Sequence, residues 1–486
     1  MYNPTQMKNV LACLFVLTTL AAKADKGYKL TFKVNGLKND TVLLANYYGD
    51  KTYVQDSAKM DAKGVAVFTG KKDLPRGIYM LVHKRRKLFE VVVVPGENFT
   101  IETDTSDYFD KIKIKDSKEN TLFYDYMKFL NTKGKLAAPL RDELVKLGKD
   151  KVNTEEYKAT QAKMKALDTE VKTYISTTLS TNSTTLFAHF VKANQDIEIP
   201  EAPKLANGRT DSTFAYKYYK AHYWDNIEFT EDGLIRTPVF HTKLENYMKK
   251  MTYQIPDSIN TSADVICNKA KPSKELFKYC VWYITNQYET SQIMGMDAVF
   301  AHMVKTFYSY KQTPWIDSTT MFKITDKASK LEPILIGKKA PNVILKDSLG
   351  IVHNLYAVPN KYTVLYFFDP DCGHCQKVTP VLTAMYDSLK REGAEVFQVG
   401  SSLKAEYSKW TAFVKKLNMK GINVADPDYQ SNFRYEYDLQ SYPQLFVLDK
   451  DKKIVGKKLA VEQLVDFLQR LNEIDKLRAA ADKGKK

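Results

Sequence analysis

The stretch Asp369-Pro370-Asp371-Cys372-Gly373-His374-Cys375 decides the fold of the C-terminal part of this 486-residue chain. It follows the near-continuous apolar run Tyr362–Phe368, which is typical of a strand buried on both faces of a sheet. Apolar residues at three- and four-residue spacing follow the second cysteine and predict a helix. The two cysteines are therefore expected where a buried strand turns into the start of a helix.

This position is suited to dithiol chemistry. Backbone N–H groups and the positive helix end stabilise a thiolate on Cys372, which lowers its pKa from about 8.5 toward 3.5–7.5. The two-residue spacing lets Cys375 reach the Cys372 sulfur and resolve a mixed disulfide with a substrate. His374 adds a cation beside the thiolate when protonated, which favours the reduced form. The motif therefore predicts a redox disulfide between Cys372 and Cys375.

Two other interpretations of the cysteine pair are half of a zinc site and a pair of structural thiols. No second Cys-x-x-Cys or His-x-His follows in the sequence, so we expect no metal. Two thiols at a helix start are not expected to stay inert in an exported protein, which is what the N-terminus described below predicts. No dissociable cofactor is expected either, because the dithiol is itself the redox centre.

Strands and helices alternate around this motif, over residues 336–478. Further strands are predicted at Val396–Val399 and Gln444–Leu448, with helices over about 405–417 and 460–471. This alternation predicts an α/β domain with helices on both faces of a sheet. Residues 479–486 are assigned to a basic tail.

The chain before this domain divides into two parts of different periodicity. Residues 25–116 alternate polar and apolar side chains between turn signals, which predicts a small antiparallel β-sandwich. Its expected strands include Tyr28–Val34, Val42–Tyr47, Val65–Phe68, Gly77–Val82, Glu90–Val94 and Phe99–Ile101. Residues 117–335 show helical spacing and predict an α-helical middle domain. Cys267 and Cys280 lie there, and the sequence leaves open whether they form a disulfide or two buried thiols.

Composition and the N-terminal sequence restrict which class of protein this chain can belong to. Hydrophobic residues make up 44% of the chain and aromatic residues 12%, too many for a disordered protein. The apolar run Val10–Ala22 is short for a membrane span and fits a signal peptide. Ala22-Lys23-Ala24 is the small-x-small pattern that signal peptidase reads, so residues 1–24 are predicted to be removed by cleavage near Ala24. We therefore expect a periplasmic or otherwise exported protein.

The net charge of +16 does not by itself indicate nucleic-acid binding. Lysines are spread along the chain rather than gathered in one segment, and the protein is predicted to be exported. No nucleic-acid partner is expected.

The C-terminal part resembles the thioredoxin superfamily, in particular exported TlpA/ResA-like thiol–disulfide oxidoreductases. The resemblance covers about residues 336–473. Its marks are Gly337-Lys338-Lys339-Ala340-Pro341, Gly350, the Phe367-Phe368 strand end, Cys372-Gly373-His374-Cys375, Pro380 and Tyr442-Pro443. The resemblance implies that Pro443 is cis and lies against the dithiol, and that Tyr442, with Gly373, contacts a bound substrate peptide. The dipeptide Gly373-His374 looks like that of protein disulfide isomerases and implies an oxidising or isomerising poise.

The sequence also departs from the family pattern. Thioredoxins carry a buried acid six residues before the first cysteine, and here that position is Tyr366. Proton transfer at Cys375 is then assigned to Asp369, Asp371 or water. The N-terminal and middle parts look like domains of unknown function that precede exported thioredoxin domains in Gram-negative bacteria.

The sequence thus predicts an exported thiol–disulfide oxidoreductase that acts on protein substrates, with a membrane-bound electron-transfer partner. The direction of electron flow does not follow from it. One alternative is a periplasmic client- or ligand-binding protein with an accessory thioredoxin-like domain. Another is a thiol peroxidase, but such enzymes place a threonine three residues before the reactive cysteine, where this chain has Asp369.

Overall fold

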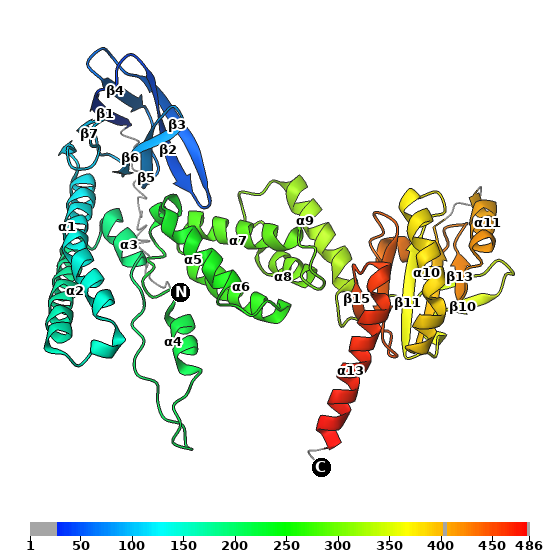
Figure 1. Cartoon of the computed structure of the whole chain (residues 1–486). Helices are drawn as coiled ribbons and strands as arrows, with labels where there is room; N and C mark the ends of the chain where they lie inside the picture. Colours follow the sequence, from blue (N-terminus) through cyan, green and yellow to red (C-terminus); the bar gives the residue numbers. More distant parts are fainter. Residues whose placement is uncertain (1–26, 402–405, 484–486) are drawn as a thin grey trace, which may run out of the picture. The chain divides into compact units, whose positions relative to one another are not determined.

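A computed structural model of the chain describes residues 27–401 and 406–483 (Figure 1). The predicted signal peptide, residues 1–24, lies outside the described residues. Of these, residues 27–195 and 233–240 form one compact unit, and residues 196–232 and the described residues from 241 to 483 form the other. Among the described helices, none has both the length and the apolar character needed to cross a bilayer.

The first unit begins with two four-stranded sheets. Their strands are β1 (Tyr28–Asn35), β2 (Thr41–Tyr48), β3 (Lys51–Lys59), β4 (Val65–Gly70), β5 (Gly77–His83), β6 (Arg86–Val93), β7 (Phe99–Asp104) and β8 (Lys113–Lys115). The strand orders are β4-β1-β7-β8 and β3-β2-β5-β6. One pair departs from the predicted antiparallel arrangement, because β1 runs parallel to β7. The long stretch of chain between these two strands makes a parallel pairing accessible.

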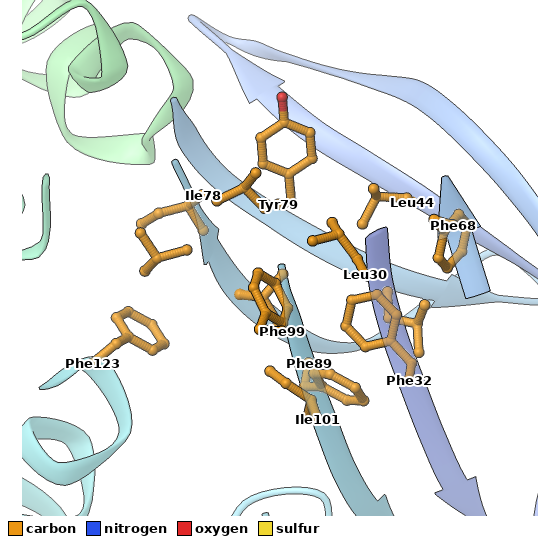
Figure 2. Close-up of a cluster of buried hydrophobic side chains, with 14 of the residues drawn as sticks. Leu30, Phe32, Leu44, Phe68, Ile78, Tyr79, Phe89, Phe99, Ile101 and Phe123 are labelled. Carbon is orange, nitrogen blue, oxygen red and sulfur yellow. The ribbon is translucent and has the colours of Figure 1, made fainter. Parts of the chain in front are cut away.

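Apolar side chains from both sheets form one core (Figure 2). Alternate residues of β1, such as Leu30 and Phe32, point into it, as does Phe99 of β7. The Phe32 ring packs edge-on against Phe68 and Phe99, with centroids 5.7 and 6.1 Å apart. Phe123, from the first helix, also contributes to this cluster.

Helices complete the first unit. α1 (Lys118–Leu147) and α2 (Glu155–Thr181) form a long antiparallel pair, and α3 (Leu186–Ala193) packs against them. The Ser117 side chain caps the N-terminus of α1 by accepting a hydrogen bond from the N–H of Asn120. The buried Glu119 carboxylate accepts the N–H groups of Leu186 and Phe187, both at 2.9 Å, and so fixes the start of α3.

The second unit begins with a helical region. Its helices are α4 (Phe214–His222), α5 (Pro238–Lys249, whose first residues belong to the other unit), α6 (Pro256–Ala270), α7 (Lys274–Glu289), α8 (Asp297–Phe307) and α9 (Ser318–Leu331). Cys267 in α6 and Cys280 in α7 are fully buried free thiols, and burial raises the pKa of both. The middle of the chain is thus helical, as predicted.

The C-terminal domain is built on a seven-stranded sheet, with strand order β10-β9-β13-β12-β11-β14-β15. The strands are β9 (Ile344–Lys346), β10 (Val352–Asn354), β11 (Tyr362–Phe368), β12 (Ala394–Gly400), β13 (Ile422–Ala425), β14 (Gln444–Leu448) and β15 (Ile454–Lys457). β11 pairs in parallel with β12 and antiparallel with β14. All of its residues are buried, as the apolar run predicted.

Helices cover both faces of this sheet. Tyr366 and Phe368 of β11 belong to one core, with α10 (Gly373–Arg391), α11 (Tyr407–Leu417) and α13 (Leu464–Lys483). Leu365 and Phe367 belong to the opposite core, with α12 (Phe433–Glu436). α13 continues to Lys483 and so includes residues assigned from the sequence to a basic tail. The predicted fold, a β-sheet domain, a helical middle and a thioredoxin-like α/β domain, is confirmed.

Candidate active site

The two cysteines of the motif lie where β11 gives way to α10. Cys372 is the N-cap residue of α10 and is partly exposed, whereas Cys375 lies in the first turn with an exposed fraction of 0%. The turn is held by the Asp371 N–H, which donates to the Asp369 carboxylate at 2.8 Å, and by the Cys372 N–H, which donates to the Asp369 carbonyl at 3.1 Å. Only one of the two sulfurs is therefore open to another molecule.

The protein shifts the pKa values of the two thiols in opposite directions. The pKa of Cys372 is lowered, chiefly because the backbone N–H of Cys375 can donate to its sulfur, with help from the Cys375 thiol and the N–H of His374. Partial burial and the charge of Asp369 oppose this shift. Burial raises the pKa of Cys375 to about 12, although the Asp369 N–H donates to its sulfur at 3.5 Å. The exposed sulfur is thus the better nucleophile.

The Tyr442–Pro443 segment lies against the exposed sulfur. The peptide bond between these residues is cis, as the resemblance implied. The Cys372 thiol donates to the Tyr442 carbonyl at 3.4 Å. The Tyr442 hydroxyl and Ser401 Oγ lie 2.5 Å apart, and Arg434 Nε donates to Ser401 Oγ at 3.3 Å. Tyr442 is therefore held beside the reactive sulfur through its side chain, which contacts Ser401, and Ser401 is in turn held by Arg434.

Tyr366 occupies the place of the acid that thioredoxins carry beneath the dithiol. It is completely buried, and its hydroxyl lies 2.9 Å from Oγ1 of Thr379, which is one helical turn beyond Cys375. Burial raises the pKa of the Tyr366 phenol, and the two cysteines add to this effect. The side chain is a neutral hydroxyl, not a second carboxylate. Thr379 was not identified from the sequence, because nothing in its local pattern distinguishes it from a core residue.

The remaining predicted residues surround the motif. Asp369 is half-buried and acts on both cysteines through its charge, while Asp371 is exposed and pairs with Lys409 at 2.8 Å. His374 is exposed on the first turn of α10. Apart from its chain neighbours and the adjacent backbone of α10, no described atom lies within 4 Å of the position where Gly373 would carry a Cβ, so this point is open to an approaching chain.

Family models match three consecutive parts of the chain. Residues 336–457 match the AhpC/TSA family, residues 154–332 a domain of unknown function (DUF5106), and residues 28–123 another (DUF4369). The cysteine motif and the Tyr442–Pro443 segment both lie within the AhpC/TSA match.

Curated relatives of the C-terminal domain are thiol–disulfide oxidoreductases. The ResA protein of one Bacillus cereus strain is 29% identical over 145 residues, which cover 29% of this chain and 80% of the relative. That of Bacillus subtilis (strain 168) is 29% identical over 126 residues, covering 26% and 67%. A solved domain of a possible thiol-disulfide isomerase from Cytophaga hutchinsonii is 37% identical, with 30% of this chain and 99% of that chain covered and a TM-score of 0.28.

Proposed function

Because residues 336–457 of this chain belong to the thioredoxin-like AhpC/TSA family and are related to ResA, we propose that the protein exchanges disulfides with protein substrates through Cys372 and Cys375. The enzyme class, thiol–disulfide oxidoreductase, follows from these relatives. One observation carries the proposal: an accessible thiol of lowered pKa stands directly in front of a buried thiol of raised pKa. This asymmetry supports an attacking and a resolving role.

In the reducing direction, the Cys372 thiolate attacks one sulfur of a substrate disulfide, and that S–S bond breaks as a mixed disulfide forms. Cys375 then loses its proton, and its thiolate attacks the Cys372 sulfur and releases the second substrate thiol. Two electrons pass from the dithiol to the substrate, and the two protons of the dithiol end on the two substrate thiols. In the oxidising direction the same steps run in reverse.

The surroundings of Cys372 support a protein as the substrate. The Tyr442 carbonyl lies 3.4 Å from the reactive sulfur and offers an acceptor to the backbone of a bound chain. The open space at Gly373, next to Cys372 in the chain, leaves room for that chain. His374, one residue further, would favour the reduced dithiol whenever its ring is protonated.

We further propose that the protein works after export and receives or passes on electrons through a membrane-bound partner. The short apolar run and small-x-small pattern in residues 1–24 support export. The curated relatives do not favour the alternative of a binding protein with an accessory thioredoxin-like domain.

The test is the reduction potential of the Cys372–Cys375 pair, measured by equilibration with glutathione buffers and mass-spectrometric trapping. A value of about −120 to −200 mV assigns the protein to oxidants and isomerases, and one near −270 mV or below to reductants. Cys375→Ser should accumulate a mixed disulfide with a protein substrate, and Cys372→Ser should not.

Two results would overturn this function. A pair that does not cycle at any glutathione ratio would remove the enzyme activity. Rapid consumption of hydrogen peroxide by the reduced protein would indicate a peroxidase instead, although Asp369 stands where such enzymes carry a threonine.

A further inference from the structure

A cavity of about 580 Å³ opens beside the dithiol, and two different parts of the second unit line it. The thioredoxin-like domain contributes His374, Val378 and Pro443. The helical region contributes Gln292, from the loop between α7 and α8, Phe300 of α8 and Leu331 of α9. The volume lies within the roughly 300–1,000 Å³ that is usual for ligand pockets. One side of the cavity thus belongs to the domain that carries the redox chemistry, and the other to helices of the DUF5106 match.

The helical wall carries a buried acceptor without a partner among the described residues. Asp297, the first residue of α8, lines the cavity and is only 5% exposed. Its carboxylate pairs with the buried Lys457, which also donates to the Ile334 carbonyl at 2.7 Å. The Oδ1 atom of Asp297 accepts no hydrogen bond from any described residue. The charge of the paired Lys457 offsets part of the free energy that a buried acceptor without a hydrogen bond costs.

The cavity adjoins the site of disulfide exchange, because His374 and Pro443 line it. The Cys372 sulfur lies 3.4 Å from the Tyr442 carbonyl, and the next residue, Pro443, lines the cavity. A chain joined to Cys372 through a disulfide and running past Pro443 would enter the cavity. Its apolar side chains would meet Val378 and Leu331, which are both partly exposed in the cavity lining.

We propose that this cavity binds the polypeptide segment next to the reacting cysteine of the substrate. Helices α7, α8 and α9 then form half of the binding site and take part in selecting the substrate. This inference rests on the proposed function, because the occupant is the chain that exchanges its disulfide with Cys372. It adds a role for the helical region, which no relative of the C-terminal domain explains.

The test compares two substrates on the reduced full chain in single turnovers. One is a synthetic peptide whose single cysteine, flanked by apolar residues, forms a mixed disulfide with thionitrobenzoate. The other is N-acetylcysteine amide activated in the same way. Attack by the Cys372 thiolate on the cysteine sulfur releases coloured thionitrobenzoate, and Cys375 then releases the reduced peptide as the protein disulfide forms. The readout is the ratio of the two rate constants.

Gln292→Trp fills the cavity from the helical wall, at an exposed position. We expect it to lower the ratio of peptide to small-substrate rate about tenfold, as loss of one buried apolar contact would. The matched control is Ile293→Trp, because Ile293 is 66% exposed and does not line the cavity. It should leave the ratio at the wild-type value.

A second wall variant with its own control keeps the test valid if Gln292→Trp fails to fold. Lys327→Trp changes the wall from α9, and Lys323→Trp, one turn earlier and exposed, is its control. An unchanged ratio in both wall variants, or an equal fall in the control variants, would overturn the inference while the proposed function stands. A wild-type protein that reacts with neither substrate would instead refute the proposed function.

Discussion

The hydroxyl of Tyr366 lies 2.9 Å from Oγ1 of Thr379, and this buried pair joins strand β11 of the thioredoxin-like domain to helix α10, at whose start both cysteines lie. Thr379 follows Cys375 by one turn of α10. The pair therefore fixes the depth at which the buried sulfur lies, at the place where thioredoxins have an acid. Its contribution to stability can be measured without touching either cysteine.

Tyr366→Phe should destabilise β11 by about 1 kcal/mol, because Thr379 loses a buried hydrogen-bond partner. Thr379→Val should have a similar effect, and the double variant should cost less than the sum of the two. Hydrogen exchange of β11 amides in the whole chain measures this, since a multidomain protein need not unfold in one step. Strict additivity would show that the two hydroxyls do not interact.

Alkylation should distinguish the two cysteines by pH. Cys372 has a lowered pKa, so its reaction with iodoacetamide should reach half of its maximal rate below the ordinary value of about 8.5. Cys375 should stay unmodified in the folded protein, because it is buried and its pKa is raised to about 12. Mass spectrometry of quenched samples locates the label. Equal labelling of both residues at neutral pH would contradict the site as described.

The raised pKa of Cys375 also makes the reduced protein sensitive to alkali. The folded state keeps the proton up to about pH 12, whereas the unfolded state loses it near 8.5, so this contribution to stability is complete below 8.5. It is lost as the pH rises from 8.5 toward 12. Relative to Cys375→Ala, the melting temperature of the reduced wild type should therefore be lower at pH 10 than at pH 7.

Substitution by alanine should destabilise the protein at one glycine of the site region and leave its stability nearly unchanged at another. A Cβ at Gly400, the last residue of β12, would overlap the indole of the buried Trp410, so Gly400→Ala should cost about 1–3 kcal/mol. Gly373 has open space around it, so Gly373→Ala should change stability by less than about 0.5 kcal/mol. Thermal unfolding of both variants in the reduced state checks this. A stable Gly400→Ala protein would mean that Trp410 moves aside easily.

His374→Ala tests the influence of the dipeptide on the redox balance. Where its ring is protonated, His374 favours the reduced dithiol, so the potential of the variant should fall by roughly 30 mV. The glutathione equilibration described above measures the shift. A potential that rises or does not change would show that His374 does not stabilise the reduced dithiol.

The strands and motifs that could be predicted are those that depend only on a short stretch of sequence. The apolar run at residues 362–368 favours a strand that is covered on both faces of a sheet. Every residue of β11 is buried, in agreement with this prediction. Strand β3 was not predicted. It lies at the edge of its sheet with most side chains in solvent, including Tyr53 and Val54 at 50% and 63% exposure, so the alternation of polar and apolar residues is missing.

The candidate site was predictable only in its local part. Cys372 and Cys375 are recognisable from their spacing, whereas the partners that hold Tyr442 come from segments distant in sequence. Ser401 lies 41 residues before Tyr442, and only the folded sheet brings its hydroxyl within 2.5 Å of the tyrosine hydroxyl. The same holds for Gln292, Asp297 and Leu331, whose helical pattern gave no indication that they line a cavity beside the dithiol.

The burial of Cys375 has a consequence for the timing of turnover. A client protein can form a bond with the outer sulfur alone, and its release is then set by a neighbour already in place. The mixed disulfide can therefore be resolved without a second molecule, because Cys375 lies beside the bond from the moment it forms. Release of the client is then a first-order step, whereas recovery of the starting redox state still needs an external electron donor or acceptor.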